Sequence, residues 1–406
     1  MTHEIHGLVV ADHEFSLPLD HANPSGETIG VFAREIAASD GRDKPFLVFL
    51  QGGPGSEAPR PITPKTPGWM ERALEDYRVL MLDQRGTGRS TPVGMLPGMS
   101  PQEQYAYLVH FRADAIVRDA EAIRQELGVE KWSVLGQSFG GFCVTTYLSY
   151  FGDSLNEAFL TGGLPPVARP TEEVYRATYE TVRERNRRYY ERYPEDLAKV
   201  QGIHERLEAE DVRLPSGDRL TSRRFRQLGM PLGMSDGAER LHYLLDFPLD
   251  SPAFLYGAES ATTFGRNPLY AAVHESCYAD GCVTNWAAQR EMPDEFASKP
   301  ELFTGEMIYP WMFEDHGALA PLRDAAELIA QHEWPALYDG AQLEKNTVPA
   351  AAAIYAEDMY VDRRFSEETA ARIKGLRPWL TNEYEHDGLR NGPVLARLLD
   401  LARGKI

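Results

Sequence analysis

The chain has 406 residues and a formal net charge of −19, because 61 acidic side chains outnumber 42 basic ones. Hydrophobic residues make up 43% and charged residues 25%, which allows a large core and argues against a chain disordered throughout. An acidic surface repels phosphate backbones, so we expect no nucleic-acid partner. Three cysteines are too few for a disulfide framework, and they favour a reducing, cytoplasmic environment.

Targeting and membrane segments are not expected. The first residues lack a basic stretch followed by an apolar one, which argues against a secretory signal. The apolar runs fall short of the ~20 residues that span a bilayer, so we expect no membrane partner.

The first third of the chain alternates between strand-like and helix-like patterns. Residues 112–127 have apolar side chains at helical spacing, and Gly128 follows as a helix stop. Strands are predicted at 8–10, 29–33, 46–50, 78–82, 132–135 and 158–160. Strands that alternate with helices indicate a parallel sheet with helical crossovers.

The pattern changes near Pro165 and returns late in the chain. Residues 171–210 predict long amphipathic helices broken at Pro194, and helical signals continue to about residue 300. Later elements are predicted as a helix at 322–331, a strand at 349–355, a helix at 366–374 and a strand at 377–384. We therefore expect an α/β core formed by residues 1–165 and 315–406, with an inserted helical cap at 166–314.

A candidate nucleophile lies in Gly136-Gln137-Ser138-Phe139-Gly140, which matches the G-x-S-x-G pattern. The motif follows a predicted buried strand and precedes a helix-like run, which is the strand–turn–helix setting of a nucleophile elbow. This context predicts an α/β-hydrolase fold in which Ser138 attacks the substrate.

A second loop could stabilise the oxyanion that such an attack produces. Gln51-Gly52-Gly53-Pro54-Gly55 follows the predicted strand 46–50, where a backbone N–H can reach a tetrahedral intermediate. We expect the N–H groups of Gly53 and Phe139 to form this oxyanion hole.

The general base and its acid should follow Ser138 in the chain. His386 lies just past the last predicted strand and is preferred to His316, which precedes a helix. Asp358 is the preferred acid and Asp362 the alternative, since both follow the penultimate strand. The predicted triad is Ser138, Asp358 and His386.

Two further groups of residues are given structural interpretations. Asp83 and Arg85 end another strand, and we expect them to form an ion pair with each other that braces the site loops. His274, Cys277 and Cys282 match no standard zinc spacing, so neither a metal nor a cofactor is expected.

Together these motifs resemble the proline iminopeptidases, a peptidase family of α/β-hydrolase fold. The most specific stretch is Asp83-Gln84-Arg85-Gly86-x-Gly88-x-Ser90. The others are Gly52-Gly53-Pro54-Gly55, Gly136-Gln137-Ser138-Phe139-Gly140-Gly141, Glu357-Asp358-Met359 and His386-Asp387-Gly388. Many members of the family have His where this chain has Gln51, which could shift the loop's hydrogen bonds and the substrate preference.

The resemblance implies an aminopeptidase that acts on peptides with a free N-terminal proline. By position in the family's motifs, Glu275 and Glu306 would hold the free amino end, and charge-assisted hydrogen bonds suit that role. Leu164, Tyr309 and Trp311 would lie near the proline ring.

Three other readings of the sequence remain open. The scaffold could serve an esterase or a carbon–carbon-bond hydrolase, which would ignore the amine. It could serve an aminopeptidase with broader N-terminal preference. It could also be a non-enzymatic ligand-binding protein, although such a protein has no use for a complete triad.

Overall fold

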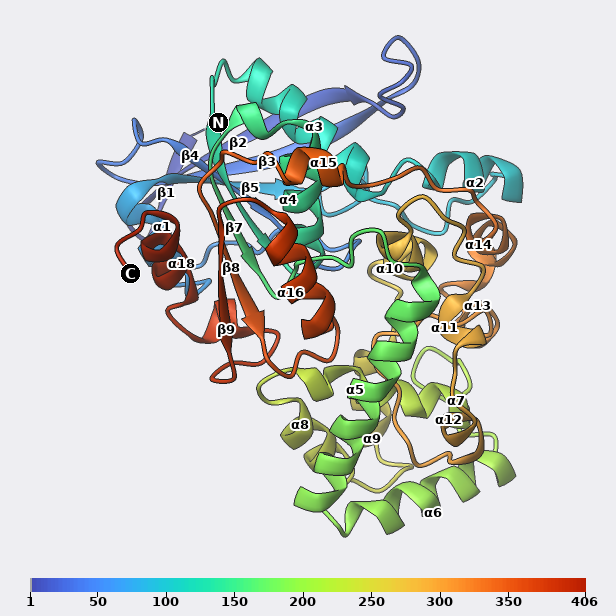
Figure 1. Ribbon diagram of the computed structural model, residues 1–406. Coiled ribbons are helices and arrows are strands. Elements are labelled where there is room, and N and C mark those ends of the chain that lie inside the picture. The colour runs from blue at the N-terminus through green and yellow to red at the C-terminus, as the bar shows by residue number, and fades with distance from the viewer. Residues whose placement is uncertain (1) are drawn as a thin grey trace.

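The computed structural model describes residues 2–406, which contain one nine-stranded sheet with helices packed around it (Figure 1). The strands are β1 (Thr2–Ile5), β2 (Leu8–Pro18), β3 (Thr28–Ala38), β4 (Phe46–Leu50), β5 (Arg78–Asp83), β6 (Trp132–Gln137), β7 (Leu155–Thr161), β8 (Ala350–Tyr355) and β9 (Leu376–Thr381). Their order in the sheet is β1-β2-β3-β5-β4-β6-β7-β8-β9. Strands β5, β4, β6, β7, β8 and β9 run parallel, and β1, β2 and β3 extend one edge antiparallel. The predicted mostly parallel sheet is confirmed.

Helices cover both faces of the sheet. The helices outside residues 166–314 are α1 (Met70–Asp76), α2 (Pro101–Leu108), α3 (Ala113–Glu126), α4 (Phe139–Tyr150), α14 (Arg323–Ala330), α15 (Gly340–Leu343), α16 (Arg363–Arg372), α17 (Gly388–Asn391) and α18 (Val394–Ala402). Along the fully buried strand β4, alternate side chains enter two different apolar cores. Phe46, Val48 and Leu50 join the core under α3 and α4, whereas Leu47 and Phe49 join the core under α1 and α18.

Two predicted strands are much longer than the sequence pattern indicated. Strands β2 and β3 have 11 residues each, and polar side chains continue both beyond their apolar segments. Cross-strand pairs keep this edge together: Arg34 binds Asp12, and the imidazole of His13 lies 3.0 Å from the Glu35 carboxylate. A search for apolar residues alone misses such a solvent-facing extension.

A helical segment is inserted between β7 and β8. Its helices are α5 (Thr171–Arg192), α6 (Asp196–Ala209), α7 (Ser222–Phe225), α8 (Gly237–Leu244), α9 (Pro252–Thr262), α10 (Pro268–Val273), α11 (Ala287–Arg290), α12 (Asp294–Ser298) and α13 (Met312–Asp315). The 3-10 helices between β7 and β8 are η2 (Arg226–Gly233), η3 (Glu275–Tyr278) and η4 (Ala320–Leu322), whereas η1 (Gly152–Ser154) precedes β7. The predicted break at Pro194 separates α5 from α6, and in Figure 1 these helices lie in a body beside the sheet.

The end of the chain returns to the sheet, and several element bounds differ from the prediction; β9, for example, ends at Thr381 rather than 384. Helix α16 begins at Arg363 rather than 366, because the Asp362 side chain caps it by accepting the N–H of Arg364. Among residues 2–406, no helix combines the length and apolar content needed to cross a membrane.

Candidate active site

The turn that holds Ser138 joins β6 to α4, as the motif predicted. Ser138 has φ 56° and ψ −127°, a strained conformation for a residue with a side chain. The flanking glycines allow close backbone packing, since a Cβ on Gly140 would lie 1.9 Å from the carbonyl oxygen of Leu50. A Cβ on Gly136 would lie 2.2 Å from the carbonyl oxygen of Gly140. The turn therefore fixes Ser138 at the carboxyl end of the sheet, where ligands bind in α/β folds.

Asp358 and His386 meet at the ends of the neighbouring strands β8 and β9. Their Oδ2 and Nδ1 atoms lie 2.7 Å apart, and both side chains are buried. The other carboxylate oxygen of Asp358 accepts the backbone N–H groups of Tyr360 and Val361, at 2.8 and 3.0 Å. Burial alone would lower the pKa of His386, but the charge and hydrogen bond of Asp358 raise it above its usual value. The imidazole is thus oriented with Nε2 left for another partner.

The competing residues have other contacts. Asp362 caps α16 and forms an ion pair with Arg364. His316 Nε2 lies 3.0 Å from Oε1 of Gln227, and burial lowers the pKa of this histidine to about 3. The geometry therefore favours Asp358 and His386 as the acid–base pair.

Ser138 and His386 line one pocket of about 310 Å³, to which the inserted helical segment also contributes side chains. Its lining consists of Gln51, Gly52, Gly53, Ser56, Gln137, Ser138, Met230, Pro231, Met234, Arg240, Glu306, Tyr360, His386 and Arg390. The loop with Gly53 packs directly on Ser138, since a Cβ on Gly52 would lie 2.9 Å from that of Ser138. Phe139 is the first residue of α4, where helical N–H groups have no partner within the helix. Both expected oxyanion donors thus belong to segments that adjoin Ser138.

Apart from Glu306, sequence reasoning missed the residues that the inserted helical segment contributes to this pocket. Met230 and Pro231 lie in η2 and Met234 just follows it, and no motif marks that irregular segment. Tyr360 was also missed, although its ring lies 4.5 Å from that of His386 and its hydroxyl donates to the carbonyl of Met230 at 2.6 Å. Met230 and Met234 are apolar, and an apolar residue in the sequence can belong either to a pocket lining or to the core.

The two cap glutamates have different environments. Glu306 lines the pocket with Ser138 and accepts a hydrogen bond from the hydroxyl of Tyr270. Glu275 is 7% exposed and does not line that pocket. Its Oε1 accepts the N–H of Ala288 at 2.9 Å, and its buried Oε2 has no hydrogen-bond partner within residues 2–406. Burial raises the pKa of this carboxyl to about 7.

The residues expected near a proline ring lie outside the pocket that contains Ser138. Leu164 is buried, and its carbonyl accepts from the hydroxyl of Ser366. Tyr309 stacks on Trp311 and shares a hydrogen bond with the Tyr179 hydroxyl at 2.9 Å. Leu164, Tyr309 and Trp311 do not line the pocket with Ser138, and their role in binding stays a prediction.

The prediction that Asp83 and Arg85 form an ion pair with each other is wrong. Asp83 instead binds Arg60 at 2.6 and 2.8 Å, and Arg85 binds Asp119 at 2.6 and 2.7 Å. Asp83 is the last residue of β5, after which the chain turns, so the two side chains reach different neighbours. The Asp83–Arg60 pair still braces the loop that leads from the pocket, because Asp83 also accepts the N–H of Ala58.

Within residues 2–406, one group has the composition of a metal site: Glu195, Asp196 and His242. Asp196 already accepts from Tyr189 at 2.6 Å and lies 2.8 Å from His242 Nδ1. Lys199 is 2.9 Å from its other oxygen, so a cation there would compete with an ammonium group. The group therefore serves as a brace between cap helices.

Comparisons with known proteins agree with this architecture. Residues 45–389 match the alpha/beta hydrolase fold family. A proline iminopeptidase of Aeromonas sobria is 48% identical over 98% of this chain and 97% of its own length. A proline iminopeptidase of Aspergillus aculeatus is 36% identical over 98% of this chain and 94% of its own.

Proposed function

Because the chain belongs to the proline iminopeptidase family of α/β hydrolases, we propose that it is a serine aminopeptidase that releases N-terminal proline from peptides. The observation that carries the proposal is the shared pocket of Ser138, His386 and Glu306, which combines a nucleophile, a base and a carboxylate. In this proposal residues 166–314 form the cap, and residues 1–165 and 315–406 form the catalytic core.

The proposed reaction proceeds through an acyl-enzyme. His386 takes the proton of Ser138 as the hydroxyl attacks the prolyl carbonyl, and Asp358 stabilises the imidazolium that forms. The N–H groups of Gly53 and Phe139 bind the oxyanion. The imidazolium then gives its proton to the departing peptide amine. Water, activated by the same histidine, releases proline and restores Ser138.

The proposed amine site uses two carboxylates. A protonated N-terminal proline has two N–H donors, which Glu275 and Glu306 would accept as charge-assisted hydrogen bonds. The buried Oε2 of Glu275 and the buried hydroxyl of Tyr175 have no partner among the described residues. Burial raises the pKa of Tyr175, and the charges of Glu275 and Glu306 raise it further, so both carboxylates act on this hydroxyl. An ammonium group would compensate these buried oxygens.

Three substrates test the proposed function on the wild-type enzyme: prolyl p-nitroanilide, its N-acetyl derivative and p-nitrophenyl acetate. We expect cleavage of the free prolyl compound and none of the blocked one. Cleavage of the ester alone would replace this function with that of an esterase.

In the same assay, Glu306→Gln should lower kcat/KM for prolyl p-nitroanilide by about 10- to 100-fold, because a neutral amide loses the charge-assisted bond. The amide oxygen can still accept from Tyr270, so the fold should be kept. Hydrolysis of p-nitrophenyl acetate should change by less than ~3-fold, since it has no amine. Equal losses on both substrates would remove Glu306 from amine recognition.

The raised pKa of Glu275 predicts a specific dependence of stability on pH. The carboxyl titrates near its ordinary 4.5 when unfolded and at about 7 when folded. Between these values the folded protein binds more protons, so stability should fall as pH rises, by about 3 kcal/mol in all. Glu275→Gln should remove this component of the slope.

Urea unfolding from pH 4.5 to pH 8 measures this effect in the absence of substrate. Glu205→Gln, at an exposed site on the cap helix α6, is the matched control and should leave the slope unchanged. Parallel pH profiles for wild type and Glu275→Gln would contradict the assignment.

A cytoplasmic location is also proposed. Cys143, Cys277 and Cys282 are all free thiols, which suits a reducing compartment.

A further inference from the structure

Asp358 and His386 lie on two separate loops, and one residue of the cap contacts both loops. We propose that Arg185, on helix α5, is a positioning residue that holds these loops in register for catalysis. Its guanidinium contacts Glu357 and Glu385, the residues directly before Asp358 and His386. The proposal rests on the function assigned to the triad.

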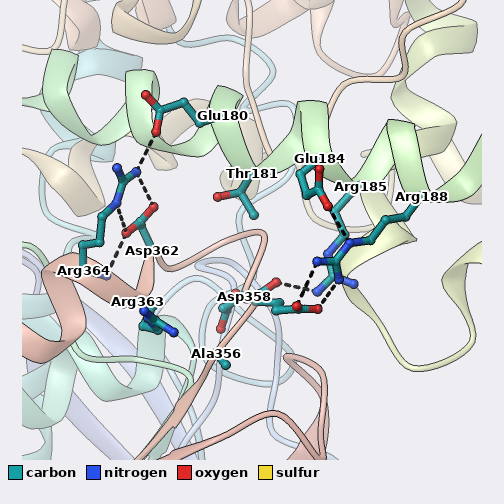
Figure 2. A pocket seen from close by; sticks show the side chains of 11 residues that line it. Glu180, Thr181, Glu184, Arg185, Arg188, Ala356, Asp358, Asp362, Arg363 and Arg364 are labelled. Atoms are coloured by element: carbon teal, nitrogen blue, oxygen red, sulfur yellow. Dashed lines mark hydrogen bonds and ion pairs between the residues drawn. The ribbon is translucent and has the colours of Figure 1, made fainter.

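The contacts of Arg185 are specific to these two loops. Nη1 donates to Oε1 of Glu385 at 2.8 Å, and Nη2 donates to its other oxygen in a bidentate pair. Nη2 also donates to the backbone carbonyl of Glu357. The Arg185 side chain is 11% exposed and that of Glu385 31%, so the bidentate pair is partly shielded from solvent and salt. Figure 2 shows Arg185 extending from α5 toward the loop of Asp358.

These contacts lie where they can limit the distance between Asp358 and His386. The last backbone bond between the neighbouring strand ends runs from Ala356 N–H to the carbonyl of Thr381 at 2.8 Å. Past this bond, the loop after β8 carries Asp358 and the loop after β9 carries His386. Arg185 bridges the two loops one residue before the hydrogen-bonded pair, and so limits how far the carboxylate and imidazole can separate. A displacement of about 1 Å at such a pair can cost roughly 100-fold in rate.

The same loops contact the cap at a second place. The N–H of His386 donates to the carbonyl of Gly233 at 3.3 Å, and Tyr360 donates to that of Met230. Both acceptors lie in η2, whereas Arg185 lies in α5. The acid–base pair is therefore held by two separate cap elements, and its geometry depends on how the cap is docked.

Arg188 provides a matched control on the same helix. It also joins α5 to the core, but it binds the Glu357 carboxylate and Glu184 through side chains alone (Figure 2). Its side chain is 43% exposed and does not contact Glu385. Loss of Arg188 thus removes a cap–core ion pair and leaves the bridge between the two loops in place.

The test compares wild type with Arg185→Ala, Arg185→Lys and Arg188→Ala. Four quantities are measured: the thermal midpoint, kcat and KM for prolyl p-nitroanilide, kcat/KM for p-nitrophenyl acetate, and the rate at which a fluorophosphonate labels Ser138. We expect Arg185→Ala to lower kcat, ester hydrolysis and labelling by a common factor of about 10 to 100, with KM within ~3-fold. Lysine should restore part of each rate, because it keeps the charge without the bidentate fork. Arg188→Ala should stay within ~2-fold of wild type.

Three results would overturn the proposal: equal behaviour of Arg185→Ala and Arg188→Ala, a loss confined to KM, or a loss confined to the prolyl substrate. If Arg185→Ala does not fold, Glu385→Ala removes the main partner from the other loop and should give a smaller loss of the same kind. Ester hydrolysis and labelling do not require proline recognition. If the wild-type enzyme does not cleave prolyl p-nitroanilide, the proposed function is refuted. The rates of ester hydrolysis and labelling still decide the role of Arg185 in that case.

Discussion

Replacing Ser138 with alanine should lower kcat for prolyl p-nitroanilide by roughly 10⁴- to 10⁶-fold. The hydroxyl is the atom that forms the acyl-enzyme in the proposed mechanism, and water cannot take its place in that step. The substitution removes one oxygen from a half-buried site and adds no volume. Alanine can adopt the backbone conformation of Ser138 at a similar cost, so the thermal midpoint should stay close to that of wild type.

Ser149→Ala is the matched control for this experiment. Ser149 is a buried serine on helix α4, which begins directly after Ser138, and its hydroxyl donates to the carbonyl of Thr145 at 2.9 Å. Its loss should leave kcat within ~2-fold, because the contact is local to the helix. Fluorophosphonate should label wild type and Ser149→Ala, and should not label Ser138→Ala. A Ser138→Ala enzyme with a substantial fraction of wild-type activity would disprove the assignment of the nucleophile.

Replacing Asp358 with asparagine should lower kcat by about 10⁴-fold. The Asp358 carboxylate accepts from Nδ1 of His386, which leaves Nε2 free to take a proton from Ser138. An amide can present an N–H to Nδ1 instead. This favours the tautomer of His386 that carries its proton on Nε2, which cannot accept the proton of Ser138. The carboxylate also raises the pKa of His386, so its loss should lower the pKa of the acidic limb in the profile of residual activity.

Asp362→Asn separates this role from a general effect of removing a nearby acid. Asp362 lies four residues later, caps α16 and pairs with Arg364. Asparagine is a good helix cap, so activity should change by less than ~3-fold and stability by about 1 kcal/mol or less. A larger kinetic loss in Asp362→Asn than in Asp358→Asn would exchange the two roles.

These expectations and the proposed role of Arg185 link catalysis to the cap in two ways. Glu275 and Glu306 are proposed to select the free amine, and Arg185 is proposed to hold the acid–base pair. Substrate recognition affects prolyl compounds alone, whereas positioning affects every acyl substrate. The ester therefore separates the two functions of the cap in all variants.

The sequence by itself determined the local features of this protein. The apolar run Phe46–Leu50, the break at Pro194 and the strand–turn–helix around Ser138 were all predicted, because each depends on residues a few positions apart. Gly136 and Gly140 are needed by backbone packing at that turn, and so they are visible as a motif. The order of the elements then sufficed to predict a mostly parallel sheet.

The tertiary structure decided which of the candidate side chains meet across the chain. Asp83 and Arg85 are two residues apart, yet each binds a partner more than 20 positions away. Asp358, the acid preferred from the sequence, reaches His386 across 28 positions, whereas the alternative Asp362 binds at a helix end. Arg185 and Glu385 are 200 positions apart. Such pairs depend on where the packed sheet and cap bring their loops, and nothing in the adjacent sequence encodes that separation.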